Sequence, residues 1–228
     1  MQMRTIVYIL LPSQPTDILT GDKSPVKDKL KVLRVFSKTI EQEQYPGPKL
    51  HDQVFRKYNR GTDSKCEPQH RQYALHELVR KLNPRIAEMD AEFVDLHRQG
   101  KVASQAMQQE YYHLISAAER TVLKERVDIV LCTCNEASSR RIRTTLKPVY
   151  CIIDECAMST EPECMVPIQR AEHVVLIGDH QQLRPVIKNH NAEVKGLGTS
   201  LFERYVGVDT YGQIQKPHLL AIQYRMVS

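Results

Sequence analysis

The sequence lacks the features that would place it in a membrane or in an oxidising compartment. No apolar run in its 228 residues approaches the roughly 18 residues that a transmembrane helix needs. The apolar run at residues 6–11 is too short for a secretory signal core and has no small-residue cleavage pattern. The 6 cysteines include no C-x-x-C pair, so we expect reduced core thiols rather than zinc ligands or disulfides. These absences favour a cytoplasmic or nuclear protein without a membrane partner.

Composition and charge suggest a folded domain with one basic end. Hydrophobic residues make up 41% of the chain, which argues against disorder and allows one core, with room for an inserted subdomain. The formal net charge is +5. Residues 1–60 carry 11 Lys and Arg against 6 Asp and Glu, whereas residues 61–228 carry 21 of each. The excess favours a polyanion near the N-terminal end, and a solvated basic face is the alternative.

Two short apolar runs, residues 149–153 and 174–177, are each followed closely by a carboxylate. Both are rich in β-branched residues and too short for helices, which is typical of parallel strands buried on both faces. Ligands of such sheets bind just beyond the carboxyl ends of the strands. We therefore expect Asp154, Glu155 and Asp179 to face one crevice of an α/β fold.

Two adjacent acids at a strand end can take different chemical roles at a bound phosphate. Asp154 can hold Mg²⁺, which binds proteins through one or two carboxylates together with substrate phosphates. Glu155 can orient or deprotonate an attacking water, and the amide of Gln182 can contact a terminal phosphate. The alternative is that Asp-Glu merely ends a strand before a turn. The second strand and the Gly-Asp-x-x-Gln-Leu sequence after it favour phosphate chemistry.

Three segments resemble motifs of superfamily 1 helicases. IIDECAMSTEPE (residues 152–163) is similar to their Walker B motif, VLIGDHQQLRPV (175–186) to motif III and QYRM (223–226) to motif IV. The motifs come in family order, and from about residue 30 onward the chain resembles the RNA helicases of the nonsense-mediated-decay type. The resemblance implies a RecA-like, three-layer parallel sheet of the P-loop NTPase type. It also implies ATP and Mg²⁺ as cofactors, and RNA or DNA as the partner.

The same resemblance assigns roles around the nucleotide. It implies catalytic roles for Glu155, Gln182 and Arg225, with Gln182 and Arg225 on the γ-phosphate. It implies that the nucleotide is bound by Asp154, Asp179 and Tyr224, and that Asp154 also holds the metal. For Arg225 the alternative is a terminal arginine in solvent.

On the nucleic-acid side, two turns resemble backbone-contacting motifs. Ser37 and Lys38 resemble motif Ib, and Thr133 and Cys134 resemble motif Ic; such contacts position the strand without reading its sequence. For Ser37 and Lys38, an edge strand with a solvated tip is an equal alternative. The arginine-rich residues 140–143 are interpreted as a solvated helix end or as additional affinity for the RNA backbone.

Residues 69–126 have helical periodicity. One stripe of apolar residues stops at Asn83-Pro84, and two further stripes meet at Gly100-Lys101, which predicts an antiparallel helical hairpin. In the family such helices form a stalk. We therefore expect two parts of a RecA-like domain, 1–68 and 127–228, separated by a stalk insertion at 69–126. Further strands are expected within the following segments: 6–11, 30–38, 127–134 and 219–222.

The phosphate-binding pattern G-x-x-x-x-G-K-[S/T] occurs nowhere in the sequence. The second RecA-like domain, with its arginine finger, is also missing. We therefore expect an incomplete first motor domain, a fragment or truncated isoform that depends on the remainder of a helicase motor and has negligible ATPase activity alone. The alternative is a non-catalytic isoform that binds RNA or a partner. One family member is linked to nuclear-receptor coactivation, but the chain has no L-x-x-L-L box to support that context.

Overall fold

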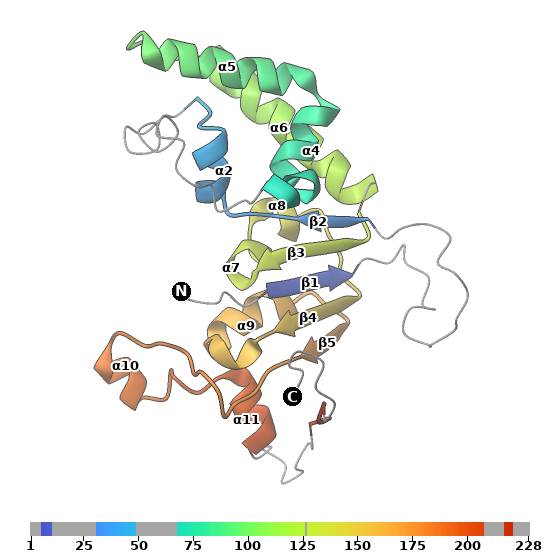
Figure 1. The fold of residues 1–228 in the computed structure, drawn as a ribbon, viewed down its shortest axis with the longest axis vertical. Helices are drawn as coiled ribbons and strands as arrows, with labels where there is room; N and C mark the ends of the chain where they lie inside the picture. Colours follow the sequence, from blue (N-terminus) through green and yellow to red (C-terminus); the bar gives the residue numbers. More distant parts are fainter. Residues whose placement is uncertain (1–5, 11–30, 49–67, 126, 208–216, 221–228) are drawn as a thin grey trace, which may run out of the picture.

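The computed structural model describes residues 6–10, 31–48, 68–125, 127–207 and 217–220. Its centre is a five-stranded sheet in the order β2-β3-β1-β4-β5 (Figure 1). Pairing is parallel between β2 and β3 and between β4 and β5, as expected for the apolar runs. The strand bounds are β1 (Ile6–Leu10), β2 (Val32–Arg34), β3 (Ile129–Thr133), β4 (Tyr150–Asp154) and β5 (His173–Leu176).

The central strand β1 departs from the predicted all-parallel sheet. It is antiparallel to both neighbours, with Ile6 opposite Thr133 on one side and Asp154 on the other. Either direction of pairing satisfies the backbone donors and acceptors of a strand, so a short apolar run does not encode its direction. Because β1 is antiparallel to both β3 and β4, those two strands run the same way. The carboxyl ends of β2, β3, β4 and β5 therefore lie along one edge.

The two strands that carry acids at their ends differ in burial. In β4, Cys151 and Ile153 are fully buried and their neighbours half-buried. In β5, Val174 is 39% exposed and Val175 is 42% exposed. The prediction of burial on both faces is thus wrong for β5, because it is an edge strand with one neighbour in the described sheet.

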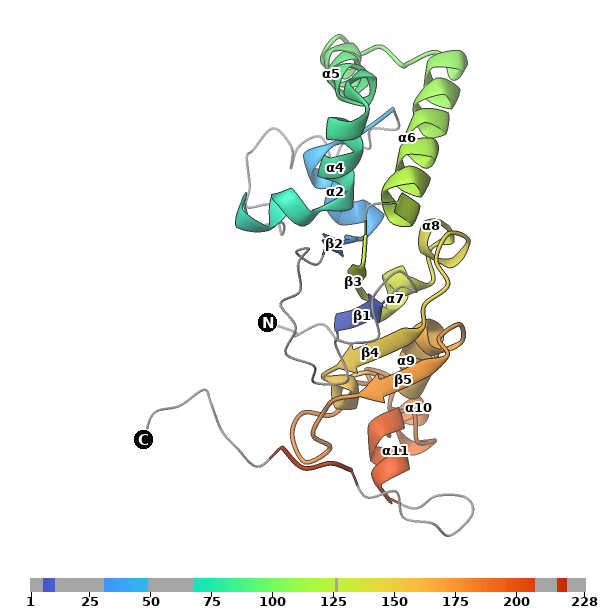
Figure 2. The same ribbon diagram turned by 90° about the vertical axis from the view of Figure 1, so that its right-hand side faces the viewer.

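Short helices follow the strands and cover one face of the sheet. α7 packs on β3 and β1 and α9 on β4, and Figure 2 shows both helices on the same side. A second helical layer across the other face, which the three-layer prediction requires, stays a prediction. The helices and 3-10 turns of this part are α7 (Cys134–Ala137), α8 (Arg140–Arg143), η2 (Cys156–Met158), α9 (Glu161–Ile168), α10 (His190–Val194) and α11 (Leu201–Gly207).

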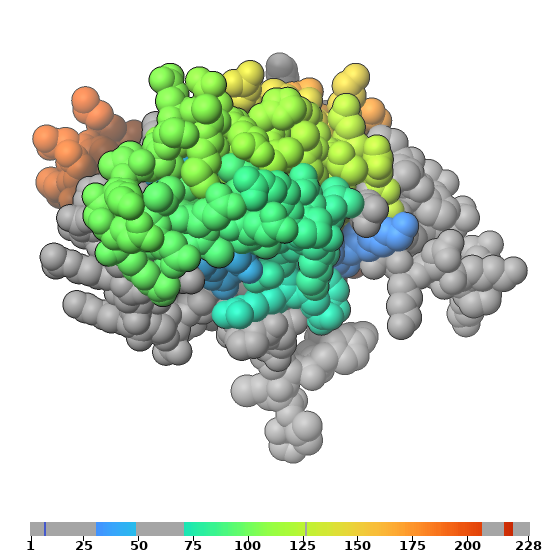
Figure 3. Space-filling model, turned by 90° about the horizontal axis from the view of Figure 1, so that it is seen from above, coloured from blue at the N-terminus to red at the C-terminus, as the bar shows by residue number. Residues whose placement is uncertain are grey.

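Three longer helices extend the molecule beyond β2 (Figure 1). Asn83 accepts a hydrogen bond from Arg85 N–H at the start of α5, and Gly100 takes a φ of 67° just after its end. The predicted helical hairpin is confirmed, and Figure 3 shows its helices across the top of the molecule, with α2 partly visible beneath them. The helices and the 3-10 turn of this part of the molecule are α2 (Lys38–Gln44), η1 (Pro68–Tyr73), α4 (Leu75–Leu82), α5 (Pro84–Arg98) and α6 (Gln105–Glu125).

One hydrophobic core joins these helices to the sheet. It contains Leu33 and Val130 of the sheet together with Met89, Phe93 and Val122 of the helices. The five described cysteines are buried and free, as predicted, and Cys66 lies outside the described residues.

Two further expectations concern the predicted last strand and membrane-spanning helices. Residues 217–220 form no strand and are exposed, so the predicted last strand is wrong for its described half. Within the ranges given above, no helix combines the length and apolarity that crossing a bilayer requires.

Candidate functional site

The turn after β4 carries two acids in an unusual backbone conformation. Glu155 has φ 54° and ψ 37°, and it is the only non-glycine residue of the described chain with a positive φ. Its N–H donates to Asp154 Oδ1 at 3.0 Å. The left-handed conformation costs a non-glycine residue about 1–2 kcal/mol, and such strain clusters at functional sites. The turn points Glu155 to solvent while Asp154 stays half-buried at the strand end.

The loop after β5 is held against this turn. Cys156 N–H donates to Ile177 O at 2.9 Å, which bonds the two strand ends together. A Cβ at Gly178 would lie 3.1 Å from Ala157 N and 3.2 Å from Cys156 Sγ. Only glycine allows so close an approach without displacing the turn. The structure thus brings the two acidic strand ends side by side.

Asp179 and Gln182 form one unit beyond β5. Asp179 accepts from Gln181 N–H at 2.9 Å and from the Gln182 side-chain amide at 3.0 Å. The Gln181 N–H first, and then the Gln182 amide, lower the pKa of Asp179, so its carboxylate is charged at neutral pH. Both side chains are exposed at the same edge as Asp154. Tyr224 and Arg225, the remaining predicted nucleotide contacts, lie outside the described residues.

The donor set at this edge fits Mg²⁺ that is carried by a nucleotide. Mg²⁺ bound through substrate phosphates needs only one or two protein carboxylates. Asp154 supplies one, with Oδ1 already oriented by the Glu155 N–H. Across the described ranges there is no group of three or more His, Cys, Asp or Glu side chains placed to hold a metal.

The turns after β2 and β3 lie along the same edge. Val35 N–H donates to Leu131 O at 2.8 Å, which aligns the two strand ends. Ser37 is the residue before α2 and makes no capping bond, while Thr133 Oγ1 caps α7 by accepting from Glu136 N–H at 3.3 Å. Cys134 is buried, and the Cys164 thiol beside it lowers the pKa of its own thiol, so the Cys134 side chain faces the interior rather than a nucleic acid.

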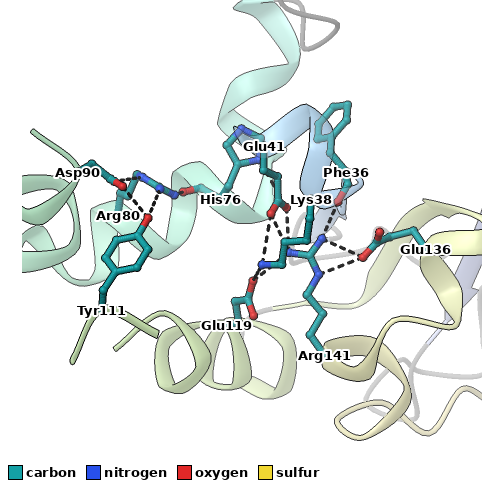
Figure 4. Close-up of polar contacts among 10 residues, drawn as sticks. All are labelled: Phe36, Lys38, Glu41, His76, Arg80, Asp90, Tyr111, Glu119, Glu136 and Arg141. Carbon is teal, nitrogen blue, oxygen red and sulfur yellow. Dashed lines mark hydrogen bonds and ion pairs between the residues drawn. The ribbon is translucent and has the colours of Figure 1, made fainter. Parts of the chain in front are cut away.

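A buried ion network joins these turns to the helices (Figure 4). Arg141 of α8 is 7% exposed at its side chain and donates to Glu41 of α2 and Glu119 of α6, each at 2.9 Å. It also donates to Glu136 of α7 at 2.8 Å and to Phe36 O at 2.5 Å. Arg141 therefore links the turn after β2 to α2, α6 and α7. Its interpretation as a solvated or RNA-binding arginine is wrong.

Opposite charges outweigh burial at two members of the network, whereas at Glu41 burial outweighs Arg141 and Lys38 and raises the pKa. Burial disfavours the charge of Arg141, but the surrounding glutamates outweigh burial and raise its pKa. Burial likewise opposes the charge of Glu119, yet Lys38 and Arg141 lower its pKa. Lys38 Nζ lies 2.8 Å from Glu119 Oε1, although its side chain remains largely exposed. The predicted RNA contact at Lys38 is therefore also part of the joint between α2 and α6.

Comparisons with known proteins decide the family. A family described as an AAA domain matches residues 16–190. Over 227 residues, 97% of this chain, the sequence is 36% identical to the 3'-5' exoribonuclease HELZ2 of Homo sapiens. It is 40% identical over 154 residues to the Regulator of nonsense transcripts 1 homolog of Neurospora crassa, which covers 67% of the chain. The chain belongs to the superfamily 1 helicases of the nonsense-mediated-decay type.

This helicase-type chain is also 41% identical over 117 residues, or 51% of its length, to the ATP-dependent helicase NAM7 of Saccharomyces cerevisiae. The aligned parts span 7% of HELZ2, 13% of the Neurospora crassa protein and 11% of NAM7. Family membership assigns the helicase-type chain to the RecA-like P-loop NTPases, as its motifs predict.

Proposed function

We propose that this chain supplies most of the first motor domain of an ATP-dependent RNA helicase. The β4–β5 edge would be the hydrolytic half of the ATP site, and the turns after β2 and β3 would bind RNA or DNA backbone. The observation that carries the proposal is the bonded pair of strand ends, with Cys156 N–H on Ile177 O at 2.9 Å and Glu155 in a left-handed conformation beside it. Strained acids at adjoining strand ends suit phosphate chemistry.

Each residue of the edge has one task in this proposal. Asp154 holds Mg²⁺ through the nucleotide, and the ion when bound neutralises charge on the phosphates. Glu155 orients and deprotonates the attacking water. Gln182, whose direction is fixed by its bond to Asp179, contacts the γ-phosphate. Two residues outside the described ranges complete the nucleotide contacts: Tyr224 and Arg225.

The nucleic-acid side uses donors from two turns. Ser37, Lys38 and Thr133 supply hydroxyl and ammonium groups, and Cys134 is the remaining candidate at the second turn. These are the donors that phosphate contacts require. The α4–α6 helices are the family's stalk, so the chain divides into 1–68, 69–126 and 127–228. We propose that the protein acts in the cytoplasm or the nucleus.

ATP turnover of the 228-residue chain tests the nucleotide half. Because the sequence contains no G-x-x-x-x-G-K-[S/T] pattern, we expect negligible hydrolysis with or without RNA. Robust turnover that disappears in Glu155→Gln and persists in Glu172→Gln, an exposed acid ahead of β5, would contradict this expectation.

RNA affinity tests the other half. Binding through a few phosphates is expected to be weak and to fall by roughly tenfold or more between about 50 and 200 mM salt. An affinity that salt leaves unchanged would argue against backbone contacts. The alternative, a non-catalytic isoform that binds RNA or a partner, is not favoured by the comparisons. They also lend no support to a nuclear-receptor context, which we do not propose.

A further inference from the structure

A cleft of about 760 Å³ lies between α2, α4, α6 and α8. Its size is in the range of small-molecule sites. No lining residue comes from β4, β5 or the loops after them, so the cleft is separate from the β4–β5 edge. The ion network of Figure 4 forms part of its wall, through Glu41, Glu119 and Arg141.

Buried polar atoms without a hydrogen-bond partner belong to residues that line this cleft. In the described ranges, three buried side-chain atoms have no hydrogen-bond partner: His76 Nδ1, Ser139 Oγ and Thr145 Oγ1. All three residues line the cleft. His76 is 4% exposed, and its Nδ1 lies 3.9 Å from Glu41 Oε1, beyond hydrogen-bond distance. Leaving such an atom unpaired costs about 1–3 kcal/mol, and each one calls for an explanation.

The His76 end of the cleft requires a hydrogen-bond donor. Burial first, and then the nearby Arg80, lower the pKa of His76 to about 3, so the ring is neutral at pH 7. Its Nε2 lies 2.5 Å from Gln44 Oε1, a carbonyl oxygen that can only accept. With Gln44 Oε1 as the acceptor, we assign the proton to Nε2, which leaves Nδ1 as an acceptor at 3.9 Å from Glu41 Oε1. An amino group of a base or a ribose hydroxyl would satisfy it.

The α8 side of the cleft suits an anion. Ser139 and Thr145 offer hydroxyl donors beside Arg140, and Arg120 faces the cleft from α6. Both arginines are exposed and make no ion pair in the described structure, whereas the lining glutamates are already paired with Arg141 or Lys38. Guanidinium and hydroxyl groups together are typical phosphate donors.

Tyr112 adds a flat apolar surface to the same cleft. Its side chain is 45% exposed, and its ring meets the edge of Tyr111. Exposed aromatic rings stack on nucleobases, with about 1–3 kcal/mol per base. We propose that the cleft binds a nucleotide, with its phosphate on Arg120 and Arg140, its base on Tyr112 and a donor group on His76. The nucleotide is a unit of a single strand or a free mononucleotide, since both share this chemistry.

An NMR titration of the full 228-residue chain tests the cleft with AMP, adenosine, inorganic phosphate and a short adenine-only RNA. We expect AMP to move the His76 Nδ1 and Tyr112 signals, while phosphate alone moves Ser139 and Thr145 and leaves His76 Nδ1 in place. Arg120→Ala and Arg140→Ala should each weaken AMP about tenfold. The matched controls lie one turn along the same helices, are exposed and do not line the cleft; they are Lys124→Ala and Arg143→Ala, expected to change affinity less than about twofold.

The outcomes distinguish an RNA strand from a free nucleotide, and they distinguish failure of this site from failure of the proposed ATP site. If RNA produces the shifts of AMP, the occupant is a strand; if only AMP does, it is a free nucleotide. No shift at millimolar AMP would overturn the nucleotide site and mean that the cleft holds only solvent. Equal weakening of AMP binding by the control variants would also overturn it, because general charge attraction would then explain the binding. Signals of residues 154–156 report the β4–β5 edge separately, so failure here leaves the proposed ATP site untouched.

Discussion

Arg141 shows how one buried cation can organise several elements. Its guanidinium bonds glutamates from α2, α6 and α7 and the Phe36 carbonyl in the turn after β2. The planar group with five donors suits such a junction better than a lysine ammonium would. The junction fixes the two turns that carry Ser37, Lys38 and Thr133 relative to the α4–α6 helices.

Replacing Arg141 should be far more costly than replacing its exposed neighbour. Arg141→Met removes a counter-charge that three buried glutamates share, so we expect a loss of about 3–5 kcal/mol in the free energy of unfolding. Urea denaturation measures it. Arg143→Met, on the same helix and exposed, should stay within about 0.5 kcal/mol. Similar midpoints for both variants would refute the buried junction.

His76 makes the free energy of unfolding depend on pH. Burial lowers its pKa to about 3 in the folded state, against about 6.5 in an unfolded chain. Between these values the unfolded state binds more protons, so stability is complete above about pH 6.5 and falls as the pH decreases. From pH 7 to 5 the His76 contribution is about 2 kcal/mol. His76→Gln should flatten this slope in urea titrations at several pH values, and an unchanged slope would rule His76 out.

At the scale of elements, Gly178 sets the distance between the turn after β4 and the loop after β5. A Cβ would meet the Ala157 backbone at 3.1 Å, whereas one at Gly198 meets nothing closer than 3.8 Å. We expect Gly178→Ala to be at least about 1 kcal/mol less stable than Gly198→Ala, since overpacking costs about 1–3 kcal/mol. Thermal or urea unfolding of the pair measures this, and equal stability would mean that the loops can separate freely.

Several elements could be predicted from local sequence. Apolar runs that end near acids located β4 and β5, and helical periodicity with Asn83-Pro84 and Gly100 as boundaries located α4, α5 and α6. These signals are local, because burial and chain termination act within a few residues.

Other features depend on residues far away in the chain. Arg141 bonds Glu41 at a separation of 100 residues and Glu119 at 22, so its sequence neighbours suggest only a solvated basic run. The direction of β1 and the exposure of β5 follow from sheet order, which no local pattern encodes. The conformation of Glu155 likewise results from the contact between two strand ends, not from its own propensity.

For the whole molecule, the decisive property is that four strands deliver their carboxyl ends to one edge. Thr133 and Asp154 flank Ile6 from opposite sides, so a single strand separates the turn after β3, proposed to bind nucleic acid, from the acidic turn after β4. The proposed nucleotide contacts and the proposed nucleic-acid contacts therefore lie along the same edge.

Broadening of backbone amide signals by Mn²⁺ with ATP tests the central claim most directly, because the ion replaces Mg²⁺ and acts only on nearby nuclei. The account predicts selective broadening of residues 154–156 and 178–182 at millimolar nucleotide, lost in Asp154→Asn and retained in the exposed control Glu172→Gln. Broadening spread over the surface, or broadening that Asp154→Asn leaves in place, would contradict it.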